Sequence, residues 1–184
     1  MSKRTKITAL KISLTACFAA ACCICTMISV PLPIGYFNLG DMLSLVSGWF
    51  LGPVFGALAA GIGGAITDLI LGFGVYAPAT FVIKAALAVT AFYLYKATKK
   101  LISSKRTDPI PRVISAIVAE LIMVGGYFIY EYAILGYGMG AAASVIGNTI
   151  QAAAGVAGGV VIATFINSSS RVLSFFNNKE EIKK

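Results

Sequence analysis

Ionisable and amide side chains lie within or at the ends of long apolar stretches of this 184-residue chain. They are Asp41, Asp68, Lys84, Glu120, Glu131, Asn148 and Gln151. Lys84 lies in the apolar run ATFVIKAALAV (79–89), where an ammonium group at mid-bilayer depth is unfavourable by about 3 kcal/mol. Such residues can bind a polar ligand, relay protons or form a structural ion pair.

Several other chemistries are excluded by what the sequence lacks. It contains no histidine, so a His-ligated metal site and a His general base are excluded. It has no G-x-x-x-x-G-K-[ST] motif, so the chain cannot be its own ATPase, and it has no H-E-x-x-H or G-x-S-x-G motif. We therefore expect a protein that is not an enzyme and that binds no cofactor or metal of its own.

The composition predicts an integral membrane protein. The mean hydropathy is +0.87 and charged residues make up 12% of the chain, whereas soluble domains carry about 25%. A helix needs about 20 apolar residues to cross a bilayer. The apolar runs are 7–30, 39–71, 78–97, 111–132 and 143–166.

The run 39–71 is too long for one crossing and short for two. Leu51-Gly52-Pro53 supplies a break within it, because proline lacks an N–H and disfavours helix in the preceding residue. Basic side chains cluster in three places, at 3–11, 96–112 and 171–184. If all three face the cytoplasm, the number of crossings between neighbouring clusters is even, and the run 39–71 must turn back on itself.

The predicted fold is therefore an all-α membrane protein with six transmembrane helices. Both termini are expected in the cytoplasm, and the second and third helices are expected to be short, with the Gly-Pro break between them. We expect one transmembrane domain over 1–184. The cytoplasmic parts are the tails at about 1–6 and 168–184 and a loop at about 98–110.

This topology brings the membrane-embedded polar side chains to one depth, in the outer half or at the midplane. Structural roles are open for several of them: Asp41 suits a first helical turn, and Asn148 and Gln151, at i and i+3, suit interhelical hydrogen bonds. Lys84 and Glu120 could form a structural ion pair. Their common depth favours the lining of a pocket that opens to the outside.

The first helix carries a small-residue pattern, Ala16-x-x-x-Ala20. Such faces allow close approach between helices in lipid. An exposed face of this kind would suit a partner helix.

Four segments carry a resemblance to a known family: PLPIGYFNLGDMLSL, LGPVFGALAAGIGGAITDLILGFGVYAPATFVIKA, YFIYEYAILGYGMGAA and IGNTIQAAAG. From about residue 8 to 165, the chain resembles the substrate-binding S component of energy-coupling factor (ECF) vitamin transporters. The resemblance implies a multi-pass protein of the bacterial cell membrane that captures a water-soluble vitamin from outside. It also implies a transmembrane coupling subunit and two cytoplasmic ATPase subunits as partners, which would use the ATP.

The resemblance also assigns roles to residues. It implies that Ala16 and Ala20 dock the coupling subunit and that the loop with Tyr36, Asn38 and Asp41 forms a lid. The implied substrate contacts are Lys84, Glu120, Tyr127, Glu131, Asn148 and Gln151.

The substrate is expected to be pyridoxine or hydroxymethylpyrimidine, with riboflavin and pantothenate as alternatives. A carboxylate-bearing ligand such as pantothenate would need Lys84 unpaired, whereas a neutral ring would allow a Lys84–Glu120 pair. A second function fits the residues as well: a self-sufficient carrier of a small polar metabolite, driven by protons through Glu120 or Asp68.

Overall fold

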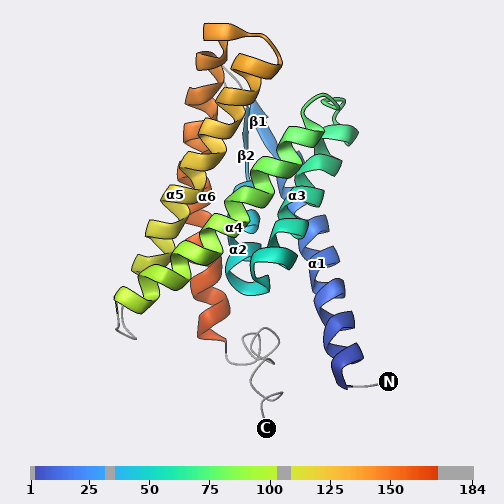
Figure 1. The fold of residues 1–184 in the computed structure, drawn as a ribbon, viewed down its shortest axis with the longest axis vertical. Coiled ribbons are helices and arrows are strands. Elements are labelled where there is room, and N and C mark those ends of the chain that lie inside the picture. Colours follow the sequence, from blue (N-terminus) through green and yellow to red (C-terminus); the bar gives the residue numbers. More distant parts are fainter. Residues whose placement is uncertain (1–2, 32–35, 103–108, 170–184) are drawn as a thin grey trace.

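The computed structural model describes residues 3–31, 36–102 and 109–169. Its long elements are helices that run roughly side by side (Figure 1). They are α1 (Lys3–Met27), α2 (Gly40–Leu51), α3 (Pro53–Ile70), α4 (Ala77–Leu101), α5 (Pro109–Ile129) and α6 (Ala142–Ser168). A π-helical turn (Tyr130–Ile134) and a 3-10 turn (Gly138–Ala141) connect α5 to α6.

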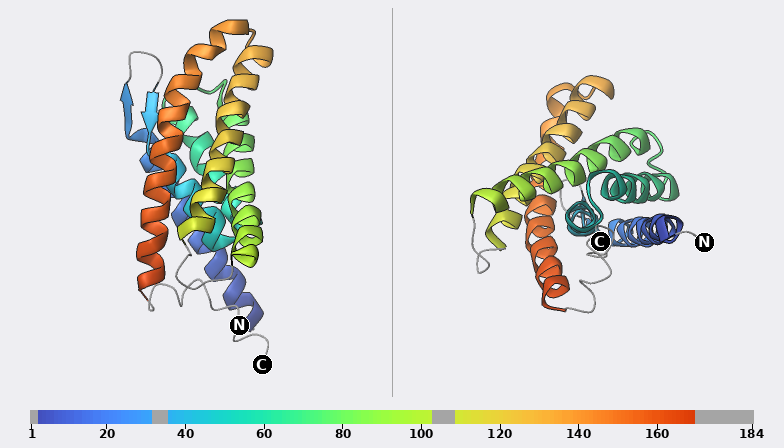
Figure 2. Two further views of the ribbon diagram at one scale, coloured as in Figure 1. Left: turned by 90° about the vertical axis from the view of Figure 1, so that its left-hand side faces the viewer. Right: turned by 60° about the horizontal axis from the view of Figure 1, so that its bottom comes forward.

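A small hairpin, not expected from the sequence, connects α1 to α2. Strands β1 (Ser29–Pro31) and β2 (Tyr36–Asn38) pair antiparallel, with Val30 opposite Phe37. Strand β2 contacts α6, and the hairpin stands beside the upper part of that helix (Figure 2). Tyr36 contributes its backbone to this pairing, but its side chain, predicted to belong to the lid, lies outside the described part of the structure.

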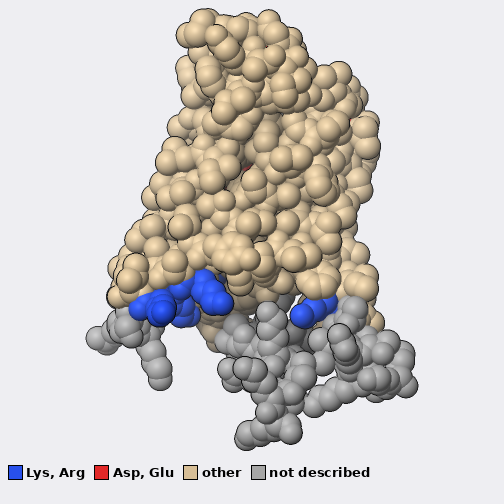
Figure 3. Space-filling view, viewed as in Figure 1, with Lys and Arg blue, Asp and Glu red and all other residues tan. Residues whose placement is uncertain are grey.

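One end of the bundle is basic. Helices α1 and α5 begin there and α4 and α6 end there (Figure 1). Lysine and arginine gather at this lower end of the face shown in Figure 3, and none is visible on the upper part. The start of α1 and the end of α6 therefore lie at the same end of the bundle as the end of α4 and the start of α5, as the even number of crossings predicts.

Five helical segments of the described chain are long and apolar enough to cross a membrane. They are Ala9–Met27, Pro53–Ile70, Ala77–Leu101, Pro109–Ile134 and Gly138–Ser168. Helix α2, with 12 residues, reaches only about 18 Å at 1.5 Å per residue and does not span a bilayer by itself. The short second helix is thus found as predicted, whereas α3, with 18 residues, is among the segments that could span.

The break between α2 and α3 falls at Gly52-Pro53. Gly52 has φ +88°, a conformation that residues with a Cβ rarely adopt, and Pro53 opens α3, where its missing N–H costs no helical hydrogen bond. The chain reverses there, and α2 packs against α3. Glycine and proline thus fold the long apolar run back on itself.

The short helix α2 occupies the centre of the bundle. It contacts α1, α3, α4 and α6, and most of its residues are buried. Leu45 and Val46 of α2 are fully buried with Leu87 of α4 and Met123 of α5 in the main apolar core. A central helix that starts inside the bundle can carry its first-turn side chains into the interior, which positions the site described below.

At the basic end, Arg112 of α5 contacts aromatic rings of α2 and α4. Its guanidinium carbon lies 4.5 Å from the ring centre of Tyr95, 5.0 Å from that of Phe50 and 5.2 Å from that of Trp49. Trp49 in turn donates a hydrogen bond from Nε1 to Ser115 Oγ at 3.1 Å. Because these rings come from α2 and α4 while Arg112 comes from α5, the cluster joins the ends of these three helices.

We expect Arg112→Met to lower the free energy of unfolding by about 2 kcal/mol, because desolvated cation–π contacts are lost. Thermal unfolding in detergent measures this change. Lys99→Met is the matched control, since Lys99 also lies over the Tyr95 ring, at 5.2 Å, but is exposed. Equal loss of stability in both variants would contradict the assigned role of Arg112.

Candidate ligand-binding site

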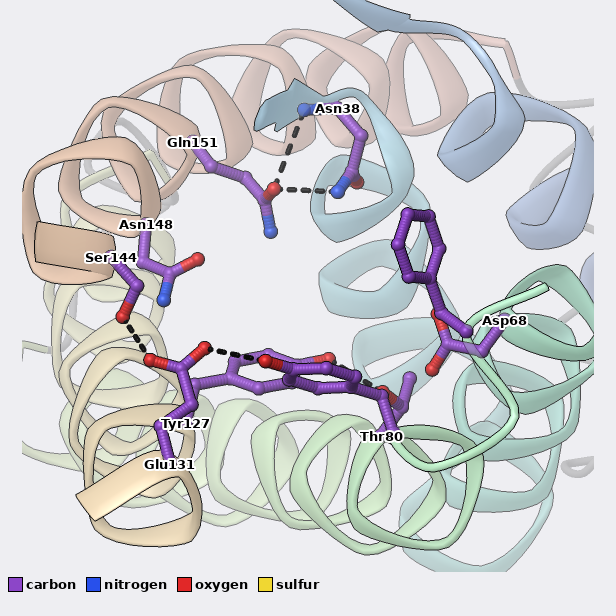
Figure 4. Close-up of a pocket in the computed structure, with 10 residues that line it drawn as sticks. Asn38, Asp68, Thr80, Tyr127, Glu131, Ser144, Asn148 and Gln151 are labelled. Atoms are coloured by element: carbon purple, nitrogen blue, oxygen red, sulfur yellow. Dashed lines mark hydrogen bonds between the residues drawn. The ribbon is translucent and has the colours of Figure 1, made fainter. Parts of the chain in front are cut away.

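A cavity of about 290 Å³ opens at the end of the bundle opposite the basic end. Figure 4 shows it between α3, α4, α5, α6 and the β2 end of the hairpin. Its lining combines amides, hydroxyls, carboxylates and aromatic rings. The lining residues are Asn38, Asp68, Phe73, Tyr76, Thr80, Tyr127, Glu131, Ser144, Asn148 and Gln151.

The structure brings together four of the predicted substrate contacts, Tyr127, Glu131, Asn148 and Gln151, at this cavity. Lys84 and Glu120 are not among its lining residues. Of the predicted lid residues, Asn38 lines the cavity, whereas Asp41 lies in the first turn of α2 and is fully buried.

Lys84 and Asp41 form a buried ion pair beneath the cavity. The Lys84 ammonium donates to Asp41 Oδ1, and the two side chains are 3% and 0% exposed. The ammonium also lies 5.9 Å from the ring centre of Tyr127, which lines the cavity. The suggested Lys84–Glu120 pair is replaced by this one, because α2 inserts Asp41 into the bundle beside α4.

Gln151 connects this ion pair to the hairpin. Its Nε2 donates to Asp41 Oδ2 at 2.5 Å, and its Oε1 accepts from the Nδ2 and backbone N–H of Asn38, at 2.5 and 3.3 Å. Asn38 Oδ1 in turn accepts from the N–H of Gly40, at the start of α2. A continuous hydrogen-bond network therefore runs from β2 through α6 to the buried charges.

Glu120 lies beside this network without joining it. Its side chain is 2% exposed, and neither carboxyl oxygen has a hydrogen-bond partner among the described residues. Gly155 of α6 makes room for it, since a Cβ there would collide with Glu120 Oε1 and come within 2.9 Å of Asp41 Cβ. Glu120 thus lies beside the Lys84–Asp41 ion pair and does not line the cavity.

Glu131 is held by hydroxyl donors at one wall of the cavity. Tyr76 donates to Glu131 Oε1 at 3.3 Å, and Ser144 donates to Oε2. Burial and the neighbouring Glu131 carboxylate raise the pKa of the Tyr76 phenol, so it stays protonated and remains a donor. The π-helical turn that follows α5 turns Glu131 inward, where it is 7% exposed.

The lining of the cavity contains acids but no base among the described residues. Asp68 and Glu131 are its two acidic residues, and neither Lys nor Arg reaches it. No group of three or more described His, Cys, Asp or Glu side chains is placed to hold a metal ion. The arrangement can therefore hold a neutral or cationic polar ring by hydrogen bonds and aromatic contacts.

The cavity lining also includes five residues that were not predicted as substrate contacts: Asp68, Phe73, Tyr76, Thr80 and Ser144. Asp68 carried a signal, as an acid within an apolar run. Thr80 and Ser144 carried none, because single hydroxyl residues are common in membrane helices. Thr80 Oγ1 accepts a hydrogen bond from the Tyr127 hydroxyl at 3.0 Å, and this bond holds the Tyr127 ring at the cavity wall.

Ala16 and Ala20, predicted to dock a partner, lie on a different face of the molecule. They are exposed and border an apolar groove of about 630 Å³ between α1 and α3. Other residues of this groove include Ile12, Phe55 and Ile62. Small side chains on α1 between larger ones on α3 give the groove room for another apolar helix.

We expect Lys84→Met to destabilise the protein by about 3–5 kcal/mol, because it leaves Asp41 buried and unpaired. The double variant Asp41→Asn/Lys84→Met should recover most of this loss, because the introduced amide can still accept from Gln151 while no charge remains. Thermal unfolding of the single and double variants in detergent gives the comparison. Additive destabilisation in the double variant would contradict the ion pair as the stabilising unit.

Comparisons with known proteins place this chain in a family. The family model described as the ECF-type riboflavin transporter, S component, matches residues 6–168. A protein of Pyrococcus woesei, described as an uncharacterized protein in the gap 3′ region, is 30% identical over 132 residues, which are 71% of this chain and 82% of that relative. The family match confirms the resemblance found in the sequence, and the chain belongs to the S-component family of ECF-type riboflavin transporters, as a substrate-binding transport subunit of the membrane.

Proposed function

We propose that this protein captures a small heteroaromatic vitamin without anionic groups, with pyridoxine or hydroxymethylpyrimidine as the best candidates. The observation that carries this proposal is the cavity lining. It offers carboxylates, amides, hydroxyls and aromatic rings, while the nearby ammonium of Lys84 is bound to Asp41. Hydroxyl and hydroxymethyl groups on a ring can donate to Glu131 and exchange hydrogen bonds with Ser144 and Asn148.

The same lining argues against an anionic vitamin such as pantothenate. A carboxylate in this cavity would face Asp68 and Glu131 without a cationic partner among the described residues, and an unpaired buried charge is strongly disfavoured. Releasing Lys84 to meet it would leave Asp41 unpaired in its place. Pantothenate is therefore the least favoured substrate among the vitamins considered.

Cavity size supports a single ring. The volume of about 290 Å³ lies at the lower limit of the roughly 300–1,000 Å³ typical of small-molecule pockets. Riboflavin is the second candidate, because the matching family model is described by that vitamin. Its three fused rings would require the cavity to widen.

Uptake is proposed to depend on partners. Basic residues favour the cytoplasmic side of a cell membrane. With the basic end on that side, the cavity at the opposite end would open to the outside. The groove with Ala16 and Ala20 would receive a helix of the ECF coupling subunit, and two ATPase subunits would supply energy. The chain itself would bind no ATP and catalyse no reaction.

Titration of the purified protein with a vitamin panel tests the substrate proposal. We expect pyridoxine or hydroxymethylpyrimidine to bind most tightly, riboflavin less tightly and pantothenate not at all, as measured by isothermal calorimetry in detergent. Tight pantothenate binding would contradict the proposal, because it needs a cation that the cavity does not offer. Preference for riboflavin would shift the assignment to the second candidate.

Ala16→Trp tests the docking proposal. The bulky ring should fill the groove, reducing vitamin uptake in cells with the coupling subunit and ATPases at least tenfold and leaving affinity in detergent within about twofold. Cys17→Trp is the matched control, because Cys17 is exposed on α1 but is not among the groove residues.

Two results would contradict this account of coupling. Normal uptake by Ala16→Trp would remove the groove from the docking role. Uptake by cells that lack the coupling subunit and ATPases, abolished by a protonophore, would instead indicate a proton-coupled carrier.

A further inference from the structure

Asp68 is an acid in an unfavourable position. It lies in the last turn of α3, which ends at Ile70, and the C-terminal end of a helix disfavours negative charge. Its Oδ2 atom is buried and has no hydrogen-bond partner among the described residues. Both features are unfavourable for folding, and buried polar atoms without partners are rare in proteins.

The local fold does not need this carboxylate. The turn after α3 is closed by backbone bonds: the N–H of Phe73 donates to the Asp68 main-chain oxygen at 2.7 Å, and that of Leu71 donates to Thr67 at 2.9 Å. Gly72, with φ +83°, supplies the reversal. Asp68 lines the cavity, and its buried Oδ2 atom has no hydrogen-bond partner among the described residues.

The two acidic residues of the cavity differ in whether their carboxylate oxygens already accept hydrogen bonds. Glu131 receives hydroxyl donors on both oxygens, from Tyr76 and Ser144. Asp68 retains an unused acceptor oxygen. Figure 4 shows the two carboxylates at opposite sides of the cavity, so a ligand between them would meet a satisfied acid at one end and an unsatisfied one at the other.

No fixed cation among the described residues is placed to satisfy Asp68. Lys84 is the basic residue that acts on it electrostatically, but the Lys84 ammonium donates to Asp41. The strongest remaining partner is a donor on the ligand. A charge-assisted bond to an N–H group satisfies a carboxylate better than a bond between neutral groups.

We propose that Asp68 is a specificity-determining residue of the substrate site, accepting a hydrogen bond from a protonated or N–H-bearing nitrogen of the ligand. This inference rests on the proposed function and deepens it. The ligand lies with its nitrogen towards α3 and its hydroxyl groups towards Glu131, Ser144 and Asn148. The site thereby selects nitrogen-bearing rings over analogues of the same shape that lack that nitrogen.

Matched ligand pairs test this inference. One pair is pyridoxine and its analogue with C–H in place of the ring nitrogen; the other is 4-amino-5-hydroxymethyl-2-methylpyrimidine and its analogue without the amino group. Affinities are measured by calorimetry for the wild-type protein and for Asp68→Asn, with Glu131→Gln as the matched acid on the other wall.

For at least one pair, the wild-type protein should bind the nitrogen-bearing ligand at least tenfold more tightly than the analogue. Asp68→Asn should weaken binding of that ligand at least tenfold and leave binding of the analogue within about twofold, so that the preference disappears. Glu131→Gln should weaken both members of the pair and keep the preference. Asp68→Ser provides the same comparison if Asp68→Asn does not fold.

Two results for Asp68→Asn would overturn the inference while leaving the proposed function in place. In one, the variant loses affinity by the same factor for both members of a pair; in the other, its affinities are unchanged. Absence of a preference in the wild-type protein, with intact binding, would do the same. If neither ring binds the wild-type protein, the proposed function fails and this inference fails with it.

Discussion

The ion pair between Lys84 and Asp41 is the interaction on which the site depends. It explains a lysine in the middle of a membrane helix, because a fully buried carboxylate meets its ammonium group. It also withdraws the nearby positive charge from the cavity, which is lined by acids, amides and hydroxyls. Through Gln151 the same pair supports Asn38, so the stability of the interior and the position of the hairpin are linked.

The central helix α2 makes this arrangement feasible. A helix of 12 residues can begin inside the bundle, whereas a full span would place its first turn near the membrane surface. The Gly52-Pro53 break lets the chain return immediately as α3, which brings Asp68 to the cavity wall. The reversal in the chain thus supplies both the buried carboxylate beneath the cavity and the unsatisfied one beside it.

Charge and length patterns predicted much of this fold. The basic clusters required an even number of crossings, and the break at 51–53 explained how the run 39–71 reverses. Of the predicted substrate contacts, Tyr127, Glu131, Asn148 and Gln151 line one cavity, whereas Lys84 and Glu120 do not. The partner of Lys84 could not be predicted, because it depends on the rotation of α2 and on how far Asp41 enters the bundle. Asp68 was not among the predicted substrate contacts, because only the three-dimensional structure shows that the backbone closes the turn after α3 and leaves Oδ2 without a partner among the described residues.

The most direct test of this account is to identify the small molecule that the protein carries through purification. Protein expressed in rich medium is denatured, and the released compounds are identified and quantified by mass spectrometry. The account predicts a stoichiometric heteroaromatic vitamin with a nitrogen donor and without carboxylate or phosphate. A stoichiometric anionic vitamin would contradict it, because Lys84 would then have to leave Asp41 for the ligand.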